Sequence, residues 1–142
     1  MKTSFPWWIY ALLSAFFAAL TAILAKVGIK GIDSDLATAV RTVVILLMVW
    51  GIVLVKGGTA EVFTLSKTNL IFLALSGIAT GLSWLFYFRA LQMGKVSNVA
   101  PVDKTSVAIA ILLSVIFLHE TVSLKGIFGA LLIITGTILI IL

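Results

Sequence analysis

Five long apolar runs fill almost the whole chain, and they limit its fold more than any other feature. A helix needs roughly 20 apolar residues to cross about 30 Å of hydrocarbon, and each run approaches or exceeds that length. Of the 142 residues, 62% are hydrophobic and 11% are charged, whereas soluble domains are roughly half apolar and about a quarter charged. A soluble fold of this size could not bury so much apolar surface. The sequence therefore predicts a polytopic integral membrane protein whose excess apolar surface is covered by lipid.

Short connections separate the five predicted spans. Backbone polar groups in lipid must bond within the protein, and the runs lack the alternation of barrel strands, so each run is predicted to be a helix. The predicted fold class is all-α, with one five-helix transmembrane domain over residues 1–142. Pro101 lies in the first turns of the fourth helix, where proline is tolerated. The spans are expected at Trp7–Ala25, Leu36–Val55, Thr68–Phe88, Val96–Leu118 and Leu124–Leu142.

The ends of two of these helices carry capping residues. Asp33 precedes the second span and Ser123 precedes the fifth. Side-chain oxygens of Asp and Ser accept hydrogen bonds from the first free backbone N–H groups of a helix. We therefore expect a residue of the segment Asp33-Ser34-Asp35 to cap the second helix and Ser123 to cap the fifth.

Positive charge is divided almost evenly across the membrane. Side A, the face of the N-terminus, carries four cationic residues, and side B, the opposite face, carries five, or six with Lys104, which lies further in. Orientation normally follows an excess of Lys and Arg in cytoplasmic loops, and this division is no clear excess. Two alternatives stay open, namely insertion in both orientations or a single orientation with side B inside. The residues are Lys2, Lys56, Lys67 and Lys125 on side A, and Lys26, Lys30, Arg41, Arg89 and Lys95 on side B.

Composition argues against several classes of function. The chain has no cysteine, which removes disulfides and thiol chemistry. It has one histidine, His119, so no histidine pair suggests a metal site. The net charge of +5 is scattered singly between apolar runs, which indicates contacts with lipid headgroups rather than with nucleic acid. No nucleophile–base pair or phosphate loop is present, so we predict no catalysis, no cofactor and no metal.

The third span carries its polar residues on one stripe. Their spacing of 4, 3 and 4 residues places them on one helical face. On the neighbouring face, Gly77 and Gly81 form a small-xxx-small pair that would let another helix approach closely. The stripe either lines a cavity, with Tyr87 as the best candidate, or its hydroxyls bond back to their own helix. The stripe consists of Ser76, Thr80, Ser83 and Tyr87.

The fourth span contains a carboxylate, Asp103, with Ser106 on the same stripe. A charge within a span is costly unless it faces protein, water or a partner charge, and Asp103 lies roughly 10 Å along the helix axis. Asp103 could bind a ligand or a proton, pair with Arg89 or Lys104, or reach the headgroups. Arg41, in the second span, is expected to anchor at the membrane surface or to pair with a loop carboxylate.

A series of short motifs runs from the third span to the fifth. Their order and spacing resemble the EamA domain of the drug/metabolite transporter superfamily, and the likeness covers essentially the whole chain. Lys26-Val27-Gly28 and Arg41 fit its first two helices. One departure is Val102-Asp103-Lys104-Thr105, where the family pattern stays apolar and often adds a second proline. The motifs are Phe86-Tyr87-Phe88-Arg89-Ala90-Leu91, Gly94, Ser97, Val99-Ala100-Pro101, Phe117-Leu118-His119-Glu120, Leu124, Gly126, Gly129 and Gly136.

This resemblance implies a secondary transporter that works by alternating access in a bacterial or archaeal cytoplasmic membrane. Family members usually carry two five-helix repeats of opposite orientation, and this chain carries one. A second copy in an antiparallel, dual-topology homodimer, or a half-size partner chain, would supply the other repeat. The expected partners are a small-molecule solute, membrane lipids and, if transport is proton-coupled, a proton carried by Asp103. The cavity would be lined by Ser76, Thr80, Ser83, Tyr87, Asp103 and Ser106.

Two other functions stay open at this stage. A subunit of a flippase for a lipid-linked metabolite would need a lateral opening and a partner chain. A scaffold subunit that transports nothing would direct its polar stripes towards neighbouring helices and have a dry interior.

Overall fold

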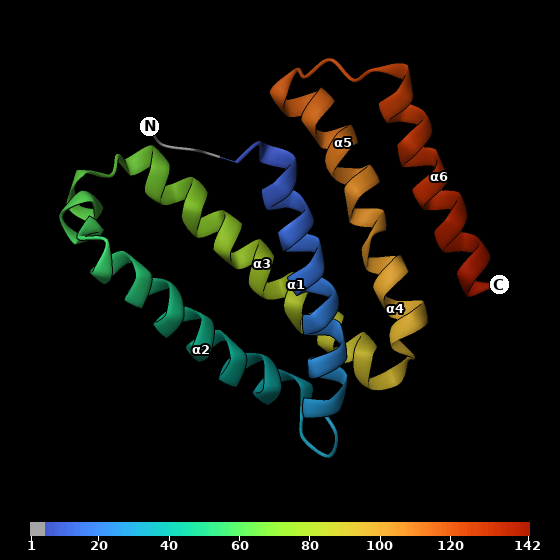
Figure 1. Cartoon of the computed structure of the whole chain (residues 1–142), viewed down its shortest axis with the longest axis horizontal. Coiled ribbons are helices and arrows are strands. Elements are labelled where there is room, and N and C mark those ends of the chain that lie inside the picture. The colour runs from blue at the N-terminus through green and yellow to red at the C-terminus, as the bar shows by residue number, and fades with distance from the viewer. Residues whose placement is uncertain (1–4) are drawn as a thin grey trace. The chain divides into compact units, whose positions relative to one another are not determined.

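The computed structural model describes residues 5–142, and the regular elements in this range are all helices. Five segments are long and apolar enough to cross a membrane, which confirms the predicted all-α fold with five spans. Lys2, which entered the charge comparison, lies outside the described residues. The helices are α1 (Trp7–Gly28), α2 (Ser34–Val55), η1 (a 3-10 helix, Gly58–Thr64), α3 (Lys67–Met93), α4 (Val96–Asp103), α5 (Thr105–Leu118) and α6 (Leu124–Ile141) (Figure 1).

Both predicted helix caps are confirmed. The Asp33 carboxylate accepts hydrogen bonds from the backbone N–H groups of Asp35 and Leu36, at 2.9 and 3.1 Å. The Ser123 hydroxyl accepts one from the backbone N–H of Gly126, at 3.2 Å. These bonds satisfy donors that the first turn of a helix leaves without an intrahelical partner.

The fourth span is interrupted, which the sequence interpretation missed. Its two helices, α4 and α5, meet at Lys104, where the backbone N–H bonds to the carbonyls of Ala100 (3.3 Å) and Pro101 (3.1 Å). Pro101 has no N–H to continue the α-helical ladder, and its ring crowds the preceding turn. The Pro101 carbonyl also accepts a hydrogen bond from the Thr137 hydroxyl of α6, at 3.1 Å. A short stretch of tighter helical bonding of this kind often marks a hinge.

The chain forms two compact units. Unit 1 contains the described residues up to Ile23 together with Met93–Leu142, and unit 2 is Leu24–Gln92. In unit 1, α5 and α6 pack side by side and α4 also contacts α6 (Figure 1). Thr137 of α6 and Ala108 of α5 are buried there.

The buried side chains of unit 2 belong to the last turns of α1, the segment leading into α2, the first turns of α2 and the last turns of α3. Side-chain bonds tie these ends together, because Lys26 donates to the Leu91 carbonyl and Gln92 donates to the Ile32 carbonyl at 2.7 Å. The rest of α3 is different, since residues 67–80 are all exposed. The buried residues of this unit are Ala25, Ile29, Ser34, Ala37, Thr38, Phe88 and Leu91.

Candidate functional site

The predicted polar stripe lies on α3, within unit 2. Ser76, Thr80 and Ser83 are exposed on the helix surface, and Tyr87, further along, is half-buried. The Thr80 hydroxyl donates to the Ser76 carbonyl at 2.9 Å. Thr80 therefore satisfies its donor within its own helix, which does not prevent its oxygen from also accepting a bond from a ligand.

The glycine face beside this stripe is also open. Cβ atoms added at Gly77 and Gly81 would meet nothing within 4 Å outside their own helix. Within unit 2, no segment makes the close approach that was predicted for this glycine face. The hydroxyl face and the glycine face of α3 are thus both uncovered within unit 2.

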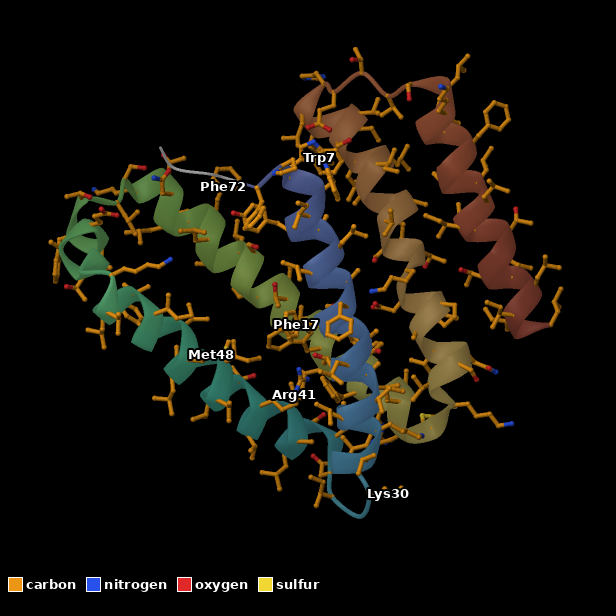
Figure 2. The ribbon with its side chains drawn as sticks, viewed as in Figure 1. Trp7, Phe17, Lys30, Arg41, Met48 and Phe72 are labelled. Atoms are coloured by element: carbon orange, nitrogen blue, oxygen red, sulfur yellow. The ribbon has the colours of Figure 1, made fainter. Side chains whose placement is uncertain are left out.

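At the other end of α3, Arg41 reaches across from α2 (Figure 2). Its guanidinium carbon lies 4.2 Å from the centre of the Phe88 ring and 5.5 Å from that of Trp84. Tyr87 is within electrostatic range of the guanidinium, and its ring makes an edge contact with Phe88 at a centroid distance of 5.7 Å. Stacking on aromatic faces is a favourable arrangement for a guanidinium.

One of the two alternatives predicted for Arg41, the pair with a loop carboxylate, was wrong. The described residues hold no carboxylate oxygen within 4.0 Å of its guanidinium. The guanidinium lies instead over the rings of Trp84 and Phe88, and its Nη1 atom is buried with no hydrogen-bond acceptor among the residues that the structure describes. The side chain extends from α2 to the aromatic rings of α3, a direction that the packing of the two helices sets.

Asp103 and Ser106, the other predicted site residues, lie in unit 1 on either side of the α4–α5 break. The Asp103 carboxylate pairs with the Lys104 ammonium at 3.1 Å, and their side chains are 33% and 57% exposed. Ser106 is exposed at the start of α5. Of the partners that the sequence left open for Asp103, the structure shows Lys104.

Sequence reasoning missed the bond between Thr137 and Pro101. Thr137 is 5% exposed, and its hydroxyl lies 2.8 Å from its own helix's Ile133 carbonyl as well as 3.1 Å from the Pro101 carbonyl. A threonine in an apolar span usually bonds back to its helix, so its sequence context carries no signal for the second contact.

A cavity of about 340 Å³ lies at the tied end of unit 2. None of the six predicted site residues lines it. Its wall is partly polar, because it includes two lysines and an amide. It lies at the ends of membrane-length helices, where lipid headgroups are expected. Its lining residues are Lys26, Ile29, Lys30, Gly31, Ile32 and Gln92.

Metal ligands do not gather anywhere in residues 5–142, where no three His, Cys, Asp or Glu side chains come together. Lone acidic groups such as Glu61 and Glu120 lie at exposed positions. The polar side chains of the predicted site and its surroundings, which include hydroxyls, the Arg41 guanidinium and the Asp103 carboxylate, are suited to hydrogen bonding and charge pairing.

Five membrane-length helices with polar groups inside the spans define an integral, multi-pass membrane protein. The EamA-like transporter family matches this chain over residues 5–142. The chain belongs to that family, and it is a membrane transporter of the drug/metabolite type.

One relative agrees with this assignment, and a second resembles part of the chain. A Sinorhizobium protein named an uncharacterized transporter is 47% identical over 134 residues, which cover 94% of this chain and 95% of the relative. An uncharacterized protein of Methanocaldococcus jannaschii is 38% identical over 66 residues, 46% of this chain and 48% of its own. No solved structure matches the chain. The bacterial and archaeal relatives fit the expected cytoplasmic membrane.

Proposed function

We propose that this protein is a secondary transporter that moves a small solute by alternating access, as an antiparallel dimer of two copies. The observation that carries the proposal is the uncovered face of α3. Residues 67–80 of this span are exposed, and they include the hydroxyl of Ser76 and the glycine face at Gly77. Lipid tails cannot bond a hydroxyl, whereas a facing helix or a water-filled cavity can.

An oppositely oriented second copy would cover this face. Many transporters are built from two repeats of inverted topology with the solute between them. Residues 5–142 contain five spans, which is one such repeat. Pairing α3 of one copy with α3 of the other would bring two stripes of Ser76, Thr80, Ser83 and Tyr87 around a shared cavity.

The balance of positive charge supports two orientations from one sequence. The lysines of side A and the cationic residues of side B are nearly equal in number, so neither face has the excess that directs insertion.

The interrupted fourth span suits the moving part of such a transporter. Discontinuous helices line binding sites in many transporters. Here Asp103 ends α4 and Ser106 lies in the first turn of α5. Asp103 is our proposed carrier of a coupling proton, because its carboxylate is the one acidic group inside the described spans beyond their first turns.

The test is to locate the C-terminus in cells with two reporters, one active only in the cytoplasm and one active only outside. We expect activity from both. Lys30→Gln with Lys95→Gln would remove charge from side B, and Lys56→Gln with Lys67→Gln would remove it from side A; these four lysines are exposed. The two pairs should shift the ratio of reporter activities in opposite directions. Activity from one reporter alone, unchanged in both variants, would contradict the antiparallel homodimer.

A further inference from the structure

Arg41 places a permanent positive charge inside a membrane span. It lies about two helical turns, roughly 10 Å, beyond the first residue of α2, in a helix of 22 residues that begins at Ser34. A guanidinium does not lose its proton under ordinary conditions. A charge at this depth is favourable only with a partner charge, a polar contact or water.

The surroundings of the guanidinium hold it without neutralising it. The rings of Phe88 and Trp84 lie at 4.2 and 5.5 Å, and they interact with its face. Nη1 is buried without an acceptor in the described part of the chain. The acidic residues lie elsewhere, in caps, loops or the fourth span: Asp33, Asp35, Glu61, Asp103 and Glu120.

We propose that Arg41 binds an oxyanion, a carboxylate or phosphate group, on the transported solute. This inference rests on the proposed transport function and narrows the solute to an anionic class. The planar fork of a guanidinium matches carboxylate and phosphate oxygens in a two-pronged geometry. Aromatic contacts on its faces leave its edges to make those bonds. Nη1 is buried without an acceptor among the described residues, so an anion that binds this atom must displace the side chains that cover it.

The position of the site favours a solute over a lipid headgroup. Arg41 lies about 10 Å from the start of a helix that is about 33 Å long. If this helix is centred in a hydrocarbon core of about 30 Å, the Arg41 backbone lies inside that core. Tyr87, the predicted lining residue, is within electrostatic range of the guanidinium. Arg41 lies over Trp84 and Phe88, each one residue after a member of the stripe, and so adds a cation from α2 beside the α3 stripe.

Trp84 provides a direct probe of binding, because its ring lies 5.5 Å from the guanidinium carbon. The chain has four tryptophans, and changing three of them to phenylalanine (Trp7, Trp8 and Trp50) leaves Trp84 as the sole reporter. The protein is placed in phosphatidylcholine nanodiscs and titrated with inorganic phosphate and, separately, with acetate. Sodium chloride keeps the ionic strength constant throughout.

We expect a saturable change in Trp84 fluorescence in the millimolar range for at least one of the two anions. Arg41→Gln should abolish the change, and Arg41→Lys, which keeps the charge but loses the fork, should weaken apparent affinity about tenfold. Lys30→Gln removes an exposed cation from the same unit and should leave the response unchanged. No saturable response in the parent, or an equal response in Arg41→Gln, would overturn the proposal.

A second arm separates the two sources of an oxyanion. In nanodiscs that contain phosphatidylglycerol, a solute site keeps its response to added anion. If the lipid headgroup fills the site, the change in Trp84 fluorescence appears without added anion and titration has no further effect, which would overturn the assignment to a solute. Binding in nanodiscs does not depend on the orientation in cells. A one-sided reporter result would therefore contradict the dimer and leave the Arg41 site standing, whereas loss of binding with two-sided reporters would contradict the Arg41 site alone.

Discussion

Two regions of this protein hold charged side chains within the predicted spans, and they stabilise these charges with different contacts. At the α4–α5 break in unit 1, Asp103 pairs with the next residue, Lys104, at 3.1 Å. In unit 2, Arg41 lies over the rings of Phe88 and Trp84, with no carboxylate in reach among the described residues. In the first region, the charges of Asp103 and Lys104 neutralise each other. In the second region, the positive charge of Arg41 has no carboxylate partner among the described residues.

The two kinds of contact differ in how much they contribute to stability. An exposed ion pair contributes about 0–1 kcal/mol, and the side chains of the Asp103–Lys104 pair are 33% and 57% exposed. A cation–aromatic contact contributes about 0.5–2 kcal/mol, and Phe88 under Arg41 is 1% exposed. By these magnitudes the contacts of Arg41 stabilise the fold at least as much as the Asp103–Lys104 pair does.

The largest effect is expected at Phe88. Phe88→Ala removes a buried ring and one of the two aromatic faces under Arg41, and it should lower the free energy of unfolding by about 3 kcal/mol. Phe86→Ala is the matched control, because Phe86 lies on the same helix and is 74% exposed. Equilibrium unfolding in mixed detergent micelles, followed by circular dichroism, measures both. If the two variants lose equal free energy of unfolding, the buried Phe88 ring contributes no more to stability than the exposed Phe86 ring.

A smaller effect is expected at the break. Thr137→Val removes the hydrogen bond to the Pro101 carbonyl while keeping the shape of the side chain, and it should cost about 1 kcal/mol in the same unfolding experiment. Thr42→Val is the control, because the Thr42 hydroxyl bonds only to the Thr38 carbonyl of its own helix, at 2.8 Å, among the hydrogen bonds found in the structure. A cost at Thr137 no greater than at Thr42 would mean that the α6 contact does not stabilise the break.

The smallest effect on stability is expected at Asp103. Asp103→Asn breaks an exposed ion pair, so the free energy of unfolding should change by less than about 1 kcal/mol. Its effect on transport should be large, because Asn cannot carry a proton. Solute uptake into proteoliposomes, measured with and without a pH gradient, should lose its dependence on the gradient.

Glu120→Gln is the control for this experiment, since Glu120 is an exposed loop carboxylate. It should leave the dependence of uptake on the gradient intact. A gradient dependence that survives in Asp103→Asn would remove Asp103 from proton coupling and leave the pair with Lys104 as a structural feature.

Much of the fold was predictable from the sequence. The contacts that the two charged regions make with other helices were not. The spans and the caps at Asp33 and Ser123 were confirmed because they depend on local properties, namely the length of apolar runs and bonds within one helical turn. The break at Lys104 was missed, although Pro101 lies one turn before it. A proline in the first turns of a helix is compatible with a continuous helix, and the Thr137 bond that accompanies the break comes from another helix.

The sequence by itself determined that this chain spans a membrane five times with a nearly even charge division, because hydrocarbon requires each backbone to satisfy its hydrogen bonds within its own helix. Only the tertiary structure decided that Arg41 meets Phe88 and Trp84 and that Thr137 bonds to Pro101. These contacts join residues of different helices, and an apolar span offers many faces of similar hydropathy. The rotation of each helix is set by packing against its neighbours, and that packing decides which face meets which.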